Sequence, residues 1–451
     1  MAEGVSRRTV LLSGGALAAL LAGGVLAVSN ARRTPDTPSF ATPDLDDLPV
    51  ADVPAPTTRP VAVVYCAGWD AAARVPVSPM SEAVARAQDT AGAQYAVVAF
   101  VDGKARAVVE VCWSAHHAEL WNVDDRGRRY RGVAYRRWPD ERLRLFEVRS
   151  WHYPEPGTPE FDGDEPAFRA RALWDGGEID RVDISVARDD GLLELVREGA
   201  DWPEPVRPEQ NMAVPAVGDW PTLAGTTGPV TVRSGPDAVP DRFPWRPPRP
   251  LRPRHVTEMT TEGTRFTTEE GEVLTIERVG AGTIRLPSGR LVVADPGWLD
   301  ADSVALADAV PPGEYPVDVF RVDKWGSVAC RVRVTDAPVA SWHLALRDGD
   351  DELALGDGEF YGNPVDTATI GLVDADGVSA YQEAEIEDVL SRASERAYRT
   401  ISDPETGTDL VVVAGWTDGA YPTWLGRTED GAIACFVVDF MIPDVDTGTP
   451  G

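Results

Sequence analysis

Residues 415–440, GWTDGAYPTWLGRTEDGAIACFVVDF, show most directly how this chain is built. The pair Asp430-Gly431, a strong turn signal, stands between two segments rich in apolar and aromatic residues. Residues 432–438 are apolar on both faces, which is typical of a central strand. The stretch therefore predicts the closing hairpin of a β domain.

The aromatic residues of this stretch allow two interpretations. Trp416, Tyr421 and Trp424 can cap the core of the domain at its edge, as half-buried sheet residues do. Alternatively they form, with Asp418, a rim that binds a ligand, since exposed aromatic rings stack on sugars or anchor a partner protein.

Similar strand patterns run through most of the chain. Alternating segments such as QYAVVAFVDGKARAVVEVCW and GTIRLPSGRLVVADP contain turn residues at their midpoints, and helix patterns are sparse. One helix is predicted within residues 78–92, capped by Ser78 or Ser81, and another over residues 379–400. The sequence predicts a mainly β protein (β-rich α+β) with two antiparallel β domains and few helices.

Proline-rich segments mark the predicted domain boundaries. Residues 32–60 read as an extended tether, and residues 203–257, which include FPWRPPRPLRPR, read as the linker between the domains. The N-terminal β-rich domain then covers residues 61–202 and the C-terminal domain residues 258–445.

The first 31 residues are typical of an export signal. Arg7 and Arg8 precede a Gly- and Ala-diluted apolar region, and this order resembles a twin-arginine signal peptide. Small residues at 29–31 suit a signal peptidase. We therefore expect a secreted or extracytoplasmic protein; the alternative is an uncleaved N-terminal membrane anchor.

The charge balance limits the classes of partner. A formal net charge of −30 repels phosphate backbones and anionic membrane surfaces, so nucleic acid is not an expected partner. The Arg-rich run at residues 126–138 is then expected to be a solvated sheet face paired with neighbouring acids, with an anionic wall polymer as the alternative. Membrane contact is expected only through the N-terminal segment.

Four motifs in the C-terminal half carry a family resemblance. IRLPSGRLVVADP at 284–296, VPPGEYPVDV at 310–319, GEFYGNPVDTATIGLVD at 358–374 and the opening stretch occur in this order. Residues 258–442 thereby resemble the bacterial domain of unknown function numbered 4241. The resemblance implies no activity, substrate, cofactor or catalytic residue.

Acidic residues beside turns are the nearest approach to a catalytic set. If folding brings Asp366, Asp374 and Asp418 together, they could bind a divalent cation or act as an acid and base pair. The same holds for Asp295, Asp376 and Asp439. Asp before Gly or Pro is, however, also ordinary turn chemistry.

The cysteines and histidines give weaker signals. Cys66 with Cys112 and Cys330 with Cys435 would give one disulfide per domain, and buried free thiols on strands are the alternative. His116 and His117 point to opposite faces if they lie on a strand, so a shared metal is not expected. Because no phosphate-loop pattern occurs in the soluble part, no cofactor is expected.

These observations favour a binding or interaction module at the cell envelope, with a glycan, a surface polymer or a protein as ligand. One alternative is a hydrolase that uses the carboxylates of the C-terminal domain. Another is a protein-interaction module of a secreted conflict system.

Overall fold

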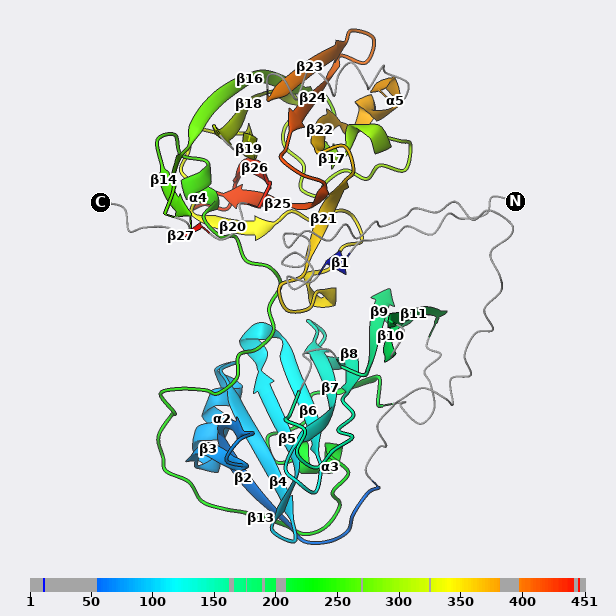
Figure 1. Ribbon diagram of the computed structural model, residues 1–451, viewed down its shortest axis with the longest axis vertical. Coiled ribbons are helices and arrows are strands. Elements are labelled where there is room, and N and C mark those ends of the chain that lie inside the picture. The colour runs from blue at the N-terminus through cyan, green and yellow to red at the C-terminus, as the bar shows by residue number, and fades with distance from the viewer. Residues whose placement is uncertain are drawn as a thin grey trace. The chain divides into compact units, whose positions relative to one another are not determined.

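The computed structural model describes residues 11–12, 55–161, 166–175, 177–188, 191–199, 208–268, 271–323, 326–381, 397–441 and 445–446 (Figure 1). The chain forms two compact units: Ala27–Pro248 is the first, and Arg249–Gly451 with Met1–Leu26 is the second. The predicted export arginines Arg7 and Arg8, and residues 32–54 of the tether, lie outside the described residues. No described helix is long and apolar enough to cross a membrane.

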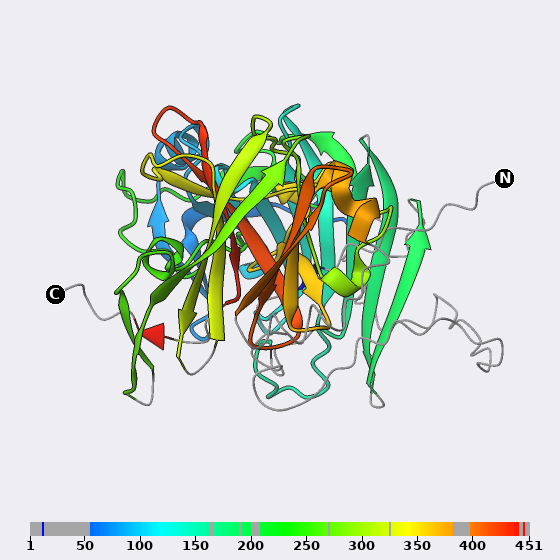
Figure 2. The same ribbon diagram turned by 90° about the horizontal axis from the view of Figure 1, so that it is seen from above.

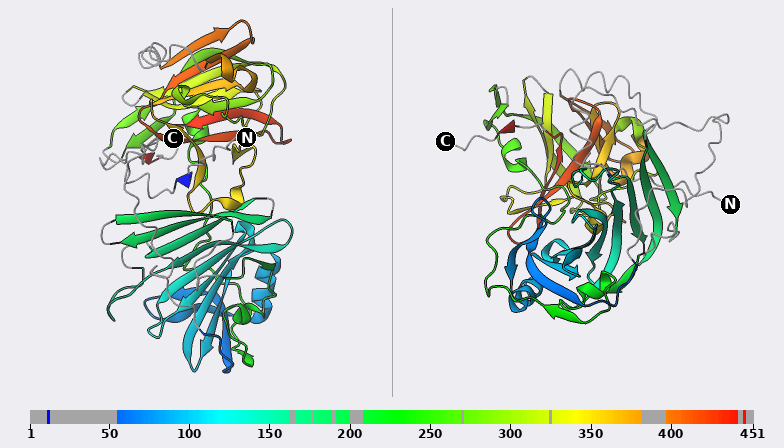
Figure 3. Two further views of the ribbon diagram at one scale, coloured as in Figure 1. Left: turned by 90° about the vertical axis from the view of Figure 1, so that its right-hand side faces the viewer. Right: turned by 60° about the horizontal axis from the view of Figure 1, so that its bottom comes forward.

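The first unit is built on one large sheet. Its elements are β2 (Val61–Asp70), β3 (Val75–Met80), α2 (Glu82–Thr90), β4 (Tyr95–Val101), β5 (Lys104–Cys112), η2 (Trp113–Ala115), β6 (His117–Val123), β7 (Arg129–Arg137), β8 (Arg142–Ser150), β9 (Phe168–Asp175), β10 (Glu178–Arg188), β11 (Gly191–Glu198), β12 (Asn211–Ala213), α3 (Trp220–Leu223) and β13 (Val230–Val232). The strands follow the order β11-β10-β9-β8-β7-β6-β5-β4-β2-β13, with β3 beside β2 and β12 beside β8. Figure 3 shows β4 to β11, in blue to green, as a strongly twisted antiparallel meander. At the other edge, β13 pairs parallel with β2.

Local sequence signals explain the start of this meander. Asp102 and Gly103 have φ of 51° and 78°, which is the backbone of the predicted two-residue hairpin turn between β4 and β5. The predicted helix is α2, and Ser81 caps it by accepting a hydrogen bond from the backbone nitrogen of Val84 at 3.3 Å. Both predictions are confirmed.

One face of the sheet carries the main core of the first unit. Side chains from β2 to β10, such as Val97, Val133 and Ile184, pack there with Ala85 of α2. Trp220 of α3 is 1% exposed in the same cluster and donates to the hydroxyl of Tyr95 at 3.0 Å.

The segment predicted as a linker therefore takes part in the folded units. Residues 211–213 and 230–232 add β12 and β13 to the first sheet, while Val256 is buried in the second unit. The proline content of this segment predicted a linker, but the apolar residues between the prolines pack into the cores of the two units.

The described residues of the second unit form three sheets. Its elements are β1 (Leu11–Leu12), α4 (Val256–Met259), β14 (Arg265–Thr268), β15 (Val273–Thr275), β16 (Glu277–Leu286), β17 (Leu291–Ala294), η3 (Pro296–Trp298), β18 (Gly313–Val322), β19 (Gly326–Arg333), β20 (Ser341–Leu344), η4 (Glu352–Ala354), β21 (Phe360–Val365), β22 (Thr369–Asp374), η5 (Ala375–Gly377), α5 (Val378–Tyr381), β23 (Tyr398–Asp403), β24 (Thr408–Ala414), β25 (Gly419–Arg427), β26 (Ile433–Asp439) and β27 (Val445–Asp446). The sheets run β1-β21-β25-β26-β19-β18-β16, with β20 beside β25, then β17-β22-β24-β23 and β15-β14-β27. Figure 2 shows the long strands β16 and β18 side by side in yellow-green.

The opening hairpin lies at the centre of the largest sheet. β25 pairs with β26, and β26 pairs in turn with β19, so the all-apolar strand is central, as predicted. One face of the sheet packs Val319 and Phe436 against Leu372 and Val411 of the four-stranded sheet. The other face buries Phe320.

The mainly β fold with few helices is thus confirmed. Of the helix predicted over residues 379–400, the start belongs to α5, and residues 382–396 lie outside the described residues. The prediction is wrong at its end, because residues 398–400 belong to strand β23, which pairs with β24.

Candidate functional site

The aromatic residues of the closing hairpin belong mostly to the core. Trp424 is 1% exposed and its Nε1 donates to Oδ2 of Asp439 at 3.0 Å. Tyr421 packs edge-on against Phe440 with ring centroids 5.0 Å apart. Trp416 remains partly exposed, and its Nε1 donates to the backbone oxygen of Phe440 at 2.8 Å. The structure therefore does not gather these rings into one exposed rim.

Asp295 organises a turn in the second unit. Its carboxylate accepts hydrogen bonds from the backbone nitrogens of Gly297 and Asp366 at 2.7 Å and of Thr367 at 3.0 Å, while its side chain is almost fully buried. Asp366 itself is exposed. Backbone donors thus occupy the Asp295 carboxylate, so it holds the chain between β21 and β22 in place.

Asp374 and Asp418 act in the same way at other turns. Asp374, fully buried, accepts from the backbone nitrogen and the hydroxyl of Ser288 at 3.0 and 2.8 Å and from Asp376 N at 2.9 Å. Asp418 is exposed, and its Oδ1 accepts from Ala368 N at 2.9 Å. Within the described ranges, no three His, Cys, Asp or Glu side chains form a group that could hold a metal ion.

Asp439 is the buried acid with the most unusual environment in this unit. It is 6% exposed and accepts hydrogen bonds from Trp424 Nε1 at 3.0 Å and from Met441 N at 2.8 Å. Burial raises the pKa of this carboxyl to about 6, and the two donors offset only part of that effect.

A network of charged side chains, which the sequence did not reveal, covers part of the face of the first sheet opposite its main core. Glu110 on β5 lies directly opposite Glu119 on β6. Arg129 Nη1 donates to Oε1 of Glu110 at 3.4 Å, and Arg149 Nη2 donates to Oε1 of Glu119. We call Glu110, Glu119, Arg129 and Arg149 the Glu–Arg network.

His117 lies at one border of this network. It is 1% exposed, its Nε2 lies 3.8 Å from Oε2 of Glu119, and its Nδ1 lies 3.1 Å from Nη1 of Arg136. Desolvation, with the positive charges of Arg136 and Arg149, lowers the pKa of His117 well below 6.5. Its neighbour His116 is an exposed left-handed residue after η2, so it lies outside the strand, and the strand on which the sequence prediction depended begins only at His117.

Aromatic rings cover the other border. The ring of Trp121 lies 5.7 Å from that of Trp151 and 5.4 Å from that of Phe161, and its Nε1 donates to Glu110 Oε2 at 3.2 Å. Burial raises the pKa of Glu110 from 4.5 to about 7. A carboxyl with this pKa can exchange a proton near neutral pH, but Glu110 is only 5% exposed. The contacts of Trp121 with Trp151 and Phe161 hold the 151–161 loop against the sheet.

The Arg-rich run at residues 126–138 is part of this packing. Arg129 also donates to Glu160 at 2.6 Å, and Arg128 pairs with Asp124 at 2.8 Å. Pairing with neighbouring acids is as predicted, but Arg131 and Arg136 are buried, so the expected solvated face is wrong for them.

The four cysteines are free and buried, which corrects the disulfide alternative. Strand β4 lies between Cys66 on β2 and Cys112 on β5, which places them about 10 Å apart, beyond disulfide reach. Cys330 is opposite Val438 and Cys435 opposite Arg333, an offset that directs the two thiols to opposite faces of the sheet.

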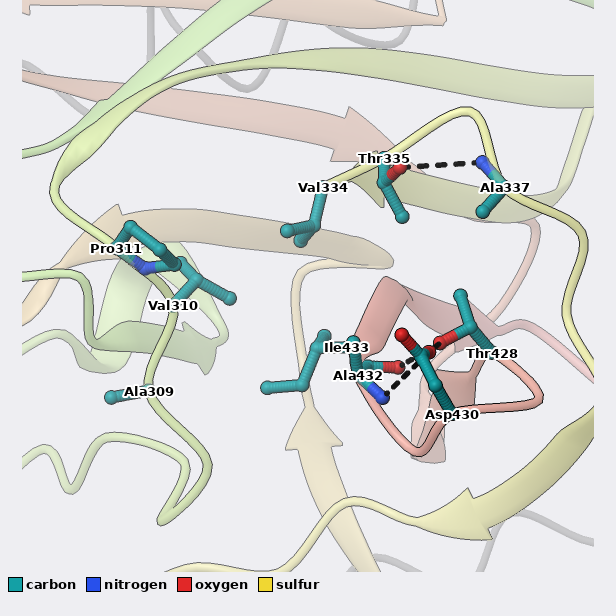
Figure 4. A pocket seen from close by; sticks show the side chains of 10 residues that line it. All are labelled: Ala309, Val310, Pro311, Val334, Thr335, Ala337, Thr428, Asp430, Ala432 and Ile433. Atoms are coloured by element: carbon teal, nitrogen blue, oxygen red, sulfur yellow. Dashed lines mark hydrogen bonds between the residues drawn. The ribbon is translucent and has the colours of Figure 1, made fainter.

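A shallow groove of about 390 Å³ lies where three loops of the second unit meet (Figure 4). Its lining residues are mostly apolar: Ala309, Val310, Pro311, Val334, Thr335, Ala337, Thr428, Asp430, Ala432 and Ile433. Internal hydrogen bonds hold the loops. Val310 N donates to Gly289 O at 2.8 Å, and Val334 N to Ala434 O at 2.9 Å. Arg427 Nη2 binds Asp308 at 2.6 Å and links two of the loops.

Gly289 explains why the loop at Val310 can approach so closely. Its φ is 73°, and a Cβ at this position would lie 2.0 Å from the backbone oxygen of Val310. Only glycine fits this contact, and it belongs to the predicted turn in the first motif of the family resemblance.

Comparison with known proteins agrees with that resemblance. No curated protein and no solved structure matches the chain. The match confirms the predicted resemblance, but over a shorter range than residues 258–442. The matched range contains every residue that lines the groove. Residues 284–438 match the family described as "Protein of unknown function (DUF4241)".

Proposed function

We propose that this protein is a non-catalytic binding module of the cell envelope, and that the groove in the family-matched region contacts its ligand. The observation that carries the proposal is the groove itself. Its volume of about 390 Å³ falls in the usual range of ligand sites. Three separate loops build it, and binding residues are often found on loops held by a rigid sheet.

The chemistry of the groove favours a protein ligand over a glycan. Val310, Val334 and Ile433 form an apolar lining, whereas sugar recognition usually adds several polar side chains. Among the lining residues, Asp430 already accepts from the hydroxyl of Thr428. An apolar side chain of a partner protein therefore fits this lining best.

The hydrolase alternative has less support. The carboxylates it requires accept hydrogen bonds from the backbone at separate turns, as Asp295 and Asp374 show. A hydrolytic role would need these carboxylates to be available to a substrate or a cation.

Filling the groove tests the proposal. Ala337 is exposed in one of the lining loops, so Ala337→Arg adds bulk without altering the core. The matched control is Ala301→Arg, at an exposed site outside the groove. We expect the wild type and A301R to be retained on an envelope fraction of the source bacterium, and A337R to be retained about tenfold less tightly. Equal retention of A337R and A301R would rule out the groove as the contact.

The envelope location is tested separately. The intact mass of the secreted protein should correspond to a chain that begins near residue 32. A full-length mass in the cytosol would contradict export, whatever the groove binds.

A further inference from the structure

The strand β11 leaves one edge of the large sheet open. All eight of its residues pair with β10, from Arg188 opposite Gly191 to Arg181 opposite Glu198. On its other side, β11 pairs with no strand in the described part of the chain. Figure 1 shows β9, β10 and β11 together at one end of the meander. At the opposite edge of the sheet, β2 pairs with the three-residue β13 and the six-residue β3.

Apart from the charges of Glu194 and Arg197, the usual protections of an edge strand are missing from β11. Its sequence, GLLELVRE, contains no proline and no lysine, and its pairing with β10 shows no bulge. Leu192 is 62% exposed and Val196 is 60% exposed, more than any other large apolar side chain among the described residues. A long regular edge with exposed apolar side chains is a site where another strand can be added.

We propose that β11 pairs antiparallel with β11 of a second copy of this chain and joins the two sheets across a twofold axis. The argument is the pattern of residues 192–196, LLELV, which has the same polarity in both directions about Glu194. A twofold interface requires such a self-complementary patch. With the axis at Glu194, Leu192 of each copy lies opposite Val196 of the other.

The two faces of the strand also agree with this register. Leu193 and Leu195 pack against the core of the first unit, while Leu192 and Val196 point the other way. Pairing about Glu194 keeps core-facing residues opposite core-facing residues, as an antiparallel ladder demands. Both exposed apolar side chains are covered in the same step.

The axis places Glu194 opposite its own copy, and this is the unfavourable contact of the interface. Like charges directly opposite each other weaken a strand pair. The net charge of −30 on each chain adds long-range repulsion, which salt screens. Removing the charge with Glu194→Gln should therefore strengthen the dimer, whereas a structural role of Glu194 elsewhere predicts no such gain.

Sedimentation equilibrium of the purified protein in about 0.5 M salt tests the proposal. We expect the wild type to dimerise below about 100 µM, Leu192→Lys and Val196→Lys to weaken dimerisation at least about tenfold, and E194Q to strengthen it about threefold or more. Val239→Lys, at another exposed valine, is the matched control and should behave as the wild type.

Two results would overturn the proposal. The first is a wild type and an E194Q variant that both stay monomeric at about 100 µM. The second is a dimer that L192K and V196K leave unchanged, because association would then use another surface. Misfolding could explain weaker dimerisation of L192K and V196K. It could not explain stronger dimerisation of E194Q, so the three variants together distinguish the proposal from misfolding.

Discussion

The buried carboxyl of Glu110 should make the stability of the first unit depend on pH near neutrality. The folded state holds this group at 5% exposure, and burial raises its pKa from 4.5 to about 7. Hydrogen bonds from Trp121 Nε1 at 3.2 Å and Arg129 Nη1 at 3.4 Å are too few to offset the desolvation of the charged form.

The sign and size follow from proton linkage. Because the folded pKa lies above the unfolded one, the folded state binds the Glu110 proton more tightly. This contribution to stability is fully present below about pH 4.5 and is lost as the pH rises through about 7. The difference between 4.5 and about 7, at about 1.36 kcal/mol per pH unit, gives about 3 kcal/mol.

His117 acts in the opposite direction in the same window. Its folded pKa is lowered well below 6.5, so the unfolded state binds that proton more tightly and stability rises with pH. Subtracting the stability of the E110Q variant from that of the wild type at each pH therefore isolates the Glu110 contribution. Glu110→Gln removes the titrating group, and the wild type should lose about 3 kcal/mol relative to E110Q between pH 4.5 and 8.

Hydrogen exchange is the suitable assay, because it reports on the first unit alone. Protection of the β5 and β6 amides, read by mass spectrometry at several pH values and corrected for intrinsic exchange, gives the free energy of opening. Glu141→Gln, on an exposed turn, is the control and should follow the wild type. A constant difference between wild type and E110Q from pH 4.5 to 8 would refute the reasoning.

Three further outcomes are expected. Gly132→Ala should cost about 1–3 kcal/mol of unfolding free energy in denaturant titrations, because the new Cβ would lie 2.7 Å from Glu119 Oε1; an unchanged midpoint would contradict this packing. Trp424→Phe should cost about 1–3 kcal/mol at neutral pH and less near pH 4, since it removes a donor to the buried Asp439 carboxylate; equal losses at both pH values would argue against that bond. The four buried thiols should resist alkylation in the native protein and react fully after denaturation without reductant; a mass about 2 Da low would reveal a disulfide.

Local patterns predicted much of the fold. The turn at Asp102-Gly103, the Ser81 cap and the central strand β26 each depend on a few adjacent residues, so the sequence shows them directly. The family resemblance was visible for the same reason, since its motifs are short turn-and-strand segments.

The Glu–Arg network could not be predicted in this way. Its members lie on four strands, and only the register that sets Glu110 opposite Glu119 brings them together. Strand alternation did not apply to His116, which lies in a turn, and it gave no indication that His117 meets Arg136 on a neighbouring strand. The need for glycine at position 132 could not be predicted either, because it arises only when the fold places Glu119 against that residue.

The same reasoning explains why the residues that looked functional in sequence are largely used by the fold. A sheet protein must fix many turns, and Asp295 and Asp374 do so by accepting backbone hydrogen bonds. Large aromatic residues beside a central strand are buried by its neighbours, as Trp424 is. Within the described residues, two features are left for a partner: the loop-lined apolar groove, and the edge of β11 that pairs with no other strand. We therefore expect recognition by this protein to depend on apolar and backbone contacts, since a formal net charge of −30 repels copies of the chain at long range and selects no particular ligand.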